Sequence, residues 1–265
     1  EACRAGHLGA YGYHRPTSPN LDRMAADGVV FENAYASASF TRSSVATLLT
    51  GLYPENHKVK VLSHSLDHRL LLLPEYLKGK GYRTAIFSSA AAVSPAFGLD
   101  RGLDEYHAFF GSWQDRERTR IRQEKLVEWF SRPGPMFTYV HFMEPHLPIV
   151  PPPPFLNMFQ PPGNREHLIR DLKRLWQERH VFTPEEISNV VADYDSTIAY
   201  VDSELGKVLD GLRERGLYDE SLIIFLSDHG ENLGEHGAWS HGDEVYEETT
   251  HVPLIVKFPA SLGLS

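Results

Sequence analysis

An acidic residue and a histidine stand side by side at the end of a hydrophobic run near the C-terminus. Asp228 and His229 directly follow residues 222–227, which read Leu-Ile-Ile-Phe-Leu-Ser. A carboxylate oxygen and an imidazole nitrogen held on one short turn suit a divalent metal such as zinc or manganese. The alternative is a capping aspartate followed by a surface histidine, and Asp-His-Gly alone does not decide between the two.

A hydroxyl-rich run is the second candidate for chemistry. Residues 41–51 read Thr-Arg-Ser-Ser-Val-Ala-Thr-Leu-Leu-Thr-Gly, and Thr41 lies where a helix through Leu49 would begin. The N–H groups and the dipole at a helix N-terminus favour an anion. A bound divalent cation would lower the pKa of the Thr41 hydroxyl and let it attack phosphorus. Taken alone, such a run is usually just a helix N-terminus, so the metal motif and the hydroxyl motif support each other.

Alternating apolar runs and helical patterns would position both candidates. Residues 84–88, 136–141 and 222–227 are mainly apolar, as strands of a sheet covered on both faces are. A helix is predicted over 184–215, capped by Thr183, and a charged helix over 116–132. Strands that alternate with helices predict a mostly parallel sheet with helices on both sides. Ligands of such sheets bind beyond the carboxyl ends of the strands.

The composition narrows the class of protein. A chain of 265 residues that is 42% hydrophobic can bury a sizeable core. The net charge of -9, without a dense basic stripe, argues against nucleic acid as a partner. The single cysteine excludes an internal disulfide and a cysteine-based zinc site. No apolar run reaches the ~18 residues that a membrane-spanning helix needs.

Three segments together resemble the sulfatase branch of the alkaline phosphatase superfamily. Residues 41–51 are similar to its Cys-x-Pro-Ser-Arg-x-x-Leu-Leu-Thr-Gly motif, and residues 227–237 to its C-terminal metal-site segment. Residues 1–13 resemble its N-terminal Asp-x-x-Arg-x-x-His-Leu-Gly-x-Tyr-Gly, with Glu1 at the first ligand position. The resemblance implies an alkaline-phosphatase-like α/β/α sandwich with a mostly parallel central sheet. It also implies that 1–265 is a single catalytic domain, a piece lacking the first strand and the C-terminal part.

The resemblance implies a metal centre and two histidines that face the substrate. One divalent metal ion is expected, zinc or manganese with calcium as an alternative, and its ligands would be Glu1, Thr41, Asp228 and His229. A glutamate in the first position is typical of the phosphoethanolamine-transferase and lipoteichoic-acid-synthase groups. His146 and His241 match substrate-side histidines, which can bind non-bridging oxygens or protonate a leaving group. The alternative for both is a solvated loop histidine. A second full metal site is not expected, because the spacing of the extra ligand pair falls on Phe142.

The nucleophile position separates phosphate from sulfate chemistry. Sulfatases make formylglycine from Cys or Ser followed by Pro or Ala two residues on and Arg four residues on, whereas this chain has Thr41, Ser43 and Val45. The resemblance therefore implies a metal-dependent phosphoester hydrolase or phosphotransferase that forms a phospho-threonine. One rival is a sulfuric ester hydrolase, because the overall string is sulfatase-like. The other is a catalytically idle binding domain, which the intact set of ligands argues against.

The resemblance implies a class of partner and does not fix the cellular location. The expected partner is a phosphate- or sulfate-ester substrate, with a lipid-linked ester among the options, and not nucleic acid. Membrane association would require segments outside this chain. The location is undecided, and an extracytoplasmic or membrane-anchored full-length protein is compatible with the resemblance.

Overall fold

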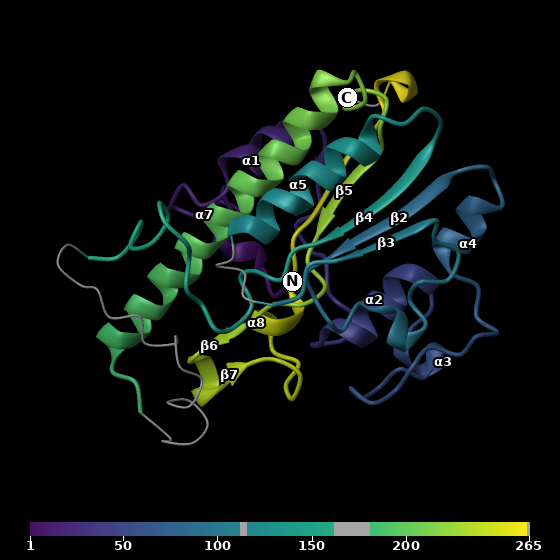
Figure 1. The fold of residues 1–265 in the computed structure, drawn as a ribbon. Helices are drawn as coiled ribbons and strands as arrows, with labels where there is room; N and C mark the ends of the chain where they lie inside the picture. The colour runs from purple at the N-terminus through teal and green to yellow at the C-terminus, as the bar shows by residue number, and fades with distance from the viewer. Residues whose placement is uncertain (112–115, 162–180, 264–265) are drawn as a thin grey trace. The chain divides into compact units, whose positions relative to one another are not determined.

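The computed structural model describes residues 1–111, 116–161 and 181–263 (Figure 1). The chain divides into two compact units, and each is described here by itself. Unit 1 comprises Glu1–Tyr35 and Glu144–Ser265, and unit 2 comprises Ala36–Met143. Each unit contains one three-stranded sheet. The α/β class expected from the alternating pattern is confirmed.

Unit 2 is built on a parallel sheet. Its elements are α2 (Thr41–Thr50), α3 (Pro54–His57), α4 (Leu73–Lys78), β2 (Arg83–Ser88), η3 (Pro95–Phe97), β3 (Glu105–Ala108), α5 (Arg116–Phe130) and β4 (Met136–His141). β2 lies between β3 and β4 and runs parallel to both, with Phe87 opposite His107 and Val140. α5 makes the crossover that a parallel β3-to-β4 connection requires. The strands predicted at 84–88 and 136–141 are confirmed, whereas β3 was not predicted.

α5 confirms the charged helix predicted over 116–132. Its inward positions carry Leu126, Trp129 and Phe130, all of them buried. The indole Nε1 of Trp129 donates a 2.8 Å hydrogen bond to Thr138 Oγ1 of β4. This bond satisfies the polar atom of a buried side chain whose ring also carries the guanidinium of Arg83, 4.5 Å from its centre.

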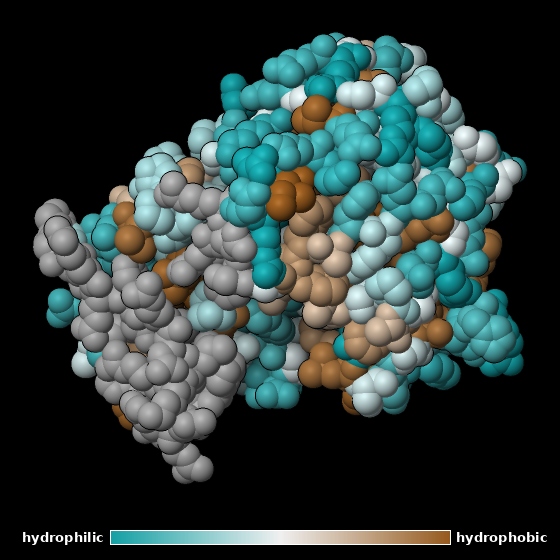
Figure 2. All heavy atoms as spheres, in the orientation of Figure 1, coloured by the Kyte–Doolittle hydropathy of each residue, from teal (hydrophilic) through white to brown (hydrophobic). Residues whose placement is uncertain are grey.

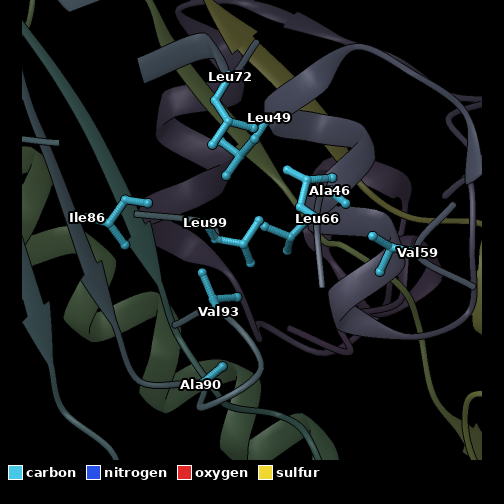
Figure 3. Packing of buried hydrophobic residues seen from close by; sticks show 10 residues of the cluster. Ala46, Leu49, Val59, Leu66, Leu72, Ile86, Ala90, Val93 and Leu99 are labelled. Atoms are coloured by element: carbon cyan, nitrogen blue, oxygen red, sulfur yellow. The ribbon is translucent and has the colours of Figure 1, made fainter. Parts of the chain in front are cut away.

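The hydrophobic core of unit 2 positions α2. Three residues of α2 enter this core, Val45, Ala46 and Leu49, and Figure 3 shows Leu49 beside Leu72. Gly51 ends the helix at a φ of 69°, a backbone conformation that glycine adopts without a steric penalty. Because one face of α2 is buried in this way, its first turn is held in a defined place within the unit.

Unit 1 contains a different sheet and the longest helix. Its elements are η1 (Ala5–His7), η2 (Gly9–Tyr11), α1 (Pro19–Ala26), β1 (Val29–Val30), α7 (Pro184–Glu214), β5 (Ile223–Leu226), β6 (Asn232–Leu233), η4 (Glu235–Gly237), β7 (Trp239–Ser240), α8 (Glu247–Thr250), β8 (Leu254–Lys257) and η5 (Ala260–Leu262). β8 lies between β1 and β5 and is antiparallel to both. The connection from β5 to β8 carries only short elements and no long crossover helix, so the alternating pattern did not reveal this direction.

α7 confirms the helix predicted over 184–215. The Thr183 side chain accepts a hydrogen bond from Glu186 N, and the Glu186 carboxylate accepts one from Thr183 N, which makes a capping box. α1 packs beside α7 (Figure 1). A Cβ at Gly206 would lie 2.7 Å from side-chain atoms of Asn20. The absence of a side chain at that position is therefore what lets the two helices approach.

Buried polar side chains of α7 hold the N-terminal segment. The Asp195 carboxylate is fully buried and accepts hydrogen bonds from Tyr13 Oη at 2.6 Å and Arg15 Nη1 at 2.7 Å. Its other oxygen lies 2.6 Å from Nδ1 of His7. The Tyr194 hydroxyl donates to Ala2 O at 2.7 Å and accepts from the backbone N–H of Arg4 at 2.9 Å. Together these bonds hold the first residues of the chain against the middle of α7.

Asp195→Ala is expected to lower the free energy of unfolding by about 3 kcal/mol, because it leaves the partly buried donors of His7, Tyr13 and Arg15 without their buried acceptor. Asp210→Ala is the control on the same helix. Asp210 forms an exposed i,i+3 pair with Arg213, and losing it should change stability by less than about 1 kcal/mol. Urea unfolding of both variants measures the difference. Equal effects would contradict a structural role for Asp195.

Within residues 1–111, 116–161 and 181–263, every helix is too short or too polar to cross a bilayer. The face of the molecule in Figure 2 is mainly hydrophilic, and its hydrophobic residues occur in small groups.

Candidate functional site

Unit 1 brings together three of the four predicted metal ligands. Nε2 of His229 lies 3.9 Å from Glu1 Oε1 and 3.5 Å from Asp228 Oδ2. The backbone nitrogen of Glu1 is 3.9 Å from Asp228 Oδ1. All three side chains are buried, with at most 3% of any of them exposed. Residues from the two ends of the sequence thus share one buried position just beyond β5.

Contacts of Ser227 and Gly230 with the backbone position these three predicted ligands. Ser227 Oγ accepts the Cys3 N–H at 2.9 Å and donates to the carbonyl of His229 at 2.8 Å, so it connects both segments. A Cβ at Gly230 would clash with the backbone oxygen of Glu248. The glycine of Asp-His-Gly therefore permits the close approach of residues 248–249 to the turn that carries the two ligands.

Both predicted substrate-side histidines lie in the same group. Nε2 of His146 is 3.7 Å from Glu1 Oε1. The ring of His241 is centred 4.7 Å from that of His146 and 4.0 Å from that of His229. One donor atom from each of Glu1, His146 and His241 lies within 4.8 Å of the others. We call the five residues Glu1, His146, Asp228, His229 and His241 the acid–histidine cluster.

Hydrogen bonds at Nδ1 orient the three imidazoles. Nδ1 of His229 lies 2.8 Å from Gly230 O, Nδ1 of His146 contacts Leu147 O, and Nδ1 of His241 is 2.7 Å from Glu231 Oε1. Carbonyl oxygens only accept, so His146 and His229 carry a proton on Nδ1 and expose the Nε2 lone pair when neutral. That tautomer can bind a metal or accept a proton.

Glu231 is a component of the site that sequence reasoning missed. Its side chain is fully buried, and Oε2 accepts the Leu147 N–H at 3.3 Å while Oε1 binds the His241 ring. One carboxylate thereby holds His241 and the backbone next to His146. Its place in Asp-His-Gly-Glu, two residues after a ligand, was the available signal, because carboxylates that orient histidines often accompany metal sites.

The electrostatics of the cluster suit a divalent cation. Burial lowers the pKa of His229, which favours the neutral form that binds metal. Burial also lowers the pKa of His241, but the hydrogen bond and charge of Glu231 outweigh it, so that pKa is raised. Two buried carboxylates beside a neutral imidazole leave net negative charge in a low-dielectric position. This donor set fits zinc or manganese better than calcium, which prefers oxygen ligands only.

Glu231→Gln is expected to lower the pKa of His241, because the carboxylate that stabilises the imidazolium becomes a neutral amide. Proton–nitrogen NMR of the histidine rings in chelator-treated protein, titrated with pH, measures it. Glu247→Gln is the control, because this glutamate is exposed in the same unit and is not bonded to a cluster residue. An unchanged His241 titration would show that Glu231 does not govern the ring.

Thr41 lies in unit 2. It is the first residue of α2 and is 5% exposed, so the predicted helix start is confirmed. Phe40 at the N-cap makes no side-chain capping bond. The structure therefore gathers five of the six predicted site residues in unit 1, and the convergence of Thr41 on them stays a prediction. The roles of all six also stay predictions.

Known proteins give an independent comparison. The family model described as Sulfatase matches residues 1–262. A sulfatase from Formosa agariphila is 25% identical over 301 residues, an alignment that covers 91% of this chain and 59% of that relative. The chain thus spans about three-fifths of the length of that relative.

Solved structures agree on the fold. The phosphonate monoester hydrolase of Agrobacterium radiobacter superposes with a TM-score of 0.81 at 23% identity, over 98% of this chain and 67% of that one. The zinc complex of the C-terminal periplasmic domain of the phosphoethanolamine transferase EptC from Escherichia coli gives 0.76 at 20% identity, over 98% and 71%. The fold is therefore α/β and alkaline-phosphatase-like, as the sequence motifs implied. With its motifs and 262 matched residues, the chain belongs to the sulfatase family.

Proposed function

We propose that residues 1–265 form a single catalytic domain that cleaves or transfers phosphate esters through Thr41. The observation that carries this proposal is the acid–histidine cluster, in which the side chains of Glu1, Asp228 and His229 are buried and which Ser227 and Glu231 hold in place. The second observation is the position of the Thr41 hydroxyl at the start of α2, where the Phe40 side chain does not cap the helix. The first turn of a helix favours an anion. The pairing of these two parts in one active site belongs to the proposal.

The cluster would hold one divalent metal ion. Glu1, Asp228 and His229 supply two carboxylates and one Nε2, and Thr41 would complete the set. When bound, the ion lowers the pKa of the threonine hydroxyl and offsets the negative charge of the ester. Zinc and manganese are the proposed ions, and a zinc complex is known for the EptC domain.

The chain's own groups account for the bond changes. Thr41 Oγ1 attacks phosphorus and gives its proton to the neutral Nε2 of His146, the bond to the ester oxygen breaks, and the alcohol leaves with a proton from a second histidine. His241 is suited to donate this proton, because Glu231 favours its protonated form. Water or an acceptor alcohol then displaces the threonine from phosphorus. The first choice makes the protein a hydrolase and the second a transferase.

Sulfate ester hydrolysis is the second candidate, because relatives such as the Formosa agariphila protein are named sulfatases. A formylglycine hydrate expels sulfate by elimination, whereas a threonine sulfate ester has no comparable route. Ser43 and Val45 at the positions of the modification motif also argue against conversion of residue 41. A catalytically idle domain is disfavoured by the intact acid–histidine cluster.

A comparison of three nitrophenyl esters tests the proposal. Purified protein with zinc or manganese added is expected to turn over nitrophenyl phosphate or bis-nitrophenyl phosphate faster than nitrophenyl sulfate. The control is the same assay after chelation, which should remove the activity. Faster release of sulfate would favour the second candidate, and inactivity on all three would favour a transferase that needs its own donor or an idle domain.

The natural substrate and location are proposed only as classes. A lipid-linked phosphate ester is one proposed substrate class, and the solved domain of the neighbour EptC is periplasmic. We propose that the full-length protein lies outside the cytoplasm. Any membrane attachment would come from segments beyond this chain.

A further inference from the structure

Arg42, the second residue of α2, is a buried cation that has no counter-charge among the described residues. Only 7% of the residue is exposed. Its Nε and Nη1 atoms are buried and have no hydrogen-bond partner among the residues that the structure describes. Within the same residues, no carboxylate forms an ion pair with it. Arginine is rarely buried without a partner, so its place needs a reason.

The described neighbours of Arg42 do not supply a hydrogen-bond acceptor for its Nε and Nη1 groups. Its Cζ lies 3.2 Å from the centre of the Phe97 ring, so the guanidinium stacks on that face. Stacking leaves the in-plane N–H groups of Nε and Nη1 without an acceptor among the described residues. The first turn of α2 has no acidic residue, and its N-cap makes no side-chain bond. Ser43 Oγ, one residue on, is also buried without a hydrogen-bond partner in the described part of the chain.

The energetic consequence is an excess of positive potential at this turn. Burial lowers the pKa of Arg42, which reflects the cost of enclosing the charged form. The helix N-terminus adds a partial positive charge of its own. A buried unpaired cation is strongly unfavourable, whereas the same cation paired with an anion is not. The planar fork of a guanidinium matches two oxygens of a tetrahedral oxyanion.

We propose that Arg42 and Ser43, with the first turn of α2, form a subsite that binds the tetrahedral oxyanion of the substrate beside Thr41. The inference rests on the proposed function and deepens it, because it names the side chains that hold the ester group. An oxyanion held here lies in the same helical turn as the hydroxyl that attacks it. The stack on Phe97 fixes the plane of the guanidinium and so the direction of its donors.

Inorganic phosphate is the probe for the test. Isothermal titration of the manganese-loaded protein at 20 °C compares the wild type with Arg42→Met, which keeps an unbranched side chain and removes the charge. Phosphate affinity is expected to fall about tenfold or more, the effect of losing charge-assisted hydrogen bonds. Arg69→Met is the matched control, because Arg69 is an exposed arginine of the same unit paired with Asp67. It should stay within twofold of the wild type.

The outcomes separate a binding role from a structural one. Without phosphate, Arg42→Met should not lower the melting temperature, since it removes an uncompensated charge. A loss of affinity below threefold overturns the subsite, and a larger loss supports it. If Arg42→Met does not fold, Arg42→Gln, which also removes the charge, decides by the same thresholds. The titration with inorganic sulfate repeats the comparison for the other ester class.

Failure of this inference is distinguishable from failure of the proposed function. Anion affinity is measured without turnover, so an Arg42-dependent phosphate site in a protein that cleaves no ester would keep the subsite and reject the enzyme. If the protein cleaves an ester and its phosphate affinity does not depend on Arg42, the proposed function is kept and the subsite is rejected.

Discussion

Thr41→Ala is expected to reduce turnover of the preferred phosphate ester by about 10⁴-fold or more, the scale seen when a nucleophile is removed. Thr41 is buried at the first position of α2, where its side chain is fixed by the helix and its core. The loss should therefore appear in kcat, with little change in stability. Thr41→Val, which keeps the shape without the hydroxyl, should lose as much activity as the alanine variant.

Thr41→Ser is the control for the nucleophile, because it keeps the hydroxyl and should retain a substantial share of the activity. Mass spectrometry of acid-quenched enzyme should find phosphate on the peptide that contains position 41 in the wild type and not in Thr41→Val. Full turnover by Thr41→Ala would mean that another group attacks the ester. Faster turnover of a sulfate ester by the unmodified threonine protein would instead promote the sulfatase alternative.

Asp228→Asn is expected to remove the metal and, with it, nearly all activity. Asp228 is buried beside His229 and Glu1, and an amide neither carries the charge nor matches the affinity of a carboxylate for a divalent ion. Elemental analysis of the dialysed protein should show metal in the wild type and about a hundredfold weaker retention in the variant. Added manganese should not restore the activity at concentrations that saturate the wild type.

His146→Ala and His241→Ala provide the contrast. As substrate-side residues they should lower turnover by about 10²-fold or more and leave the metal content nearly unchanged. The geometry makes this a demanding test, since donor atoms of Glu1, His146 and His241 lie within 4.8 Å of one another. If either alanine variant loses the metal, that histidine is a ligand and the one-metal assignment is wrong.

Secondary structure was largely predictable because its signals are local. The capping residue Thr183, the proline after it and the spacing of apolar residues specified α7 to within one residue of its observed end. Mainly apolar runs specified β2, β4 and β5. β3 was missed because Glu105-Tyr106-His107-Ala108 lacks an apolar run, and only pairing with β2 makes it a strand. The antiparallel direction of β8 likewise depends on its partners.

The sequence by itself determined the family, the fold class and the candidate residues, because motif strings keep residue types at fixed spacing along the chain. Only the tertiary structure placed Glu1 beside Asp228 and His229, with more than 220 residues between them. It also revealed that Glu231 holds His241, and that Arg42 is a buried cation stacked on Phe97. The burial of a side chain and the charges around it depend on segments that are distant in sequence. No local sequence pattern contains this information, so the roles of Glu231 and Arg42 appear only once the chain is folded.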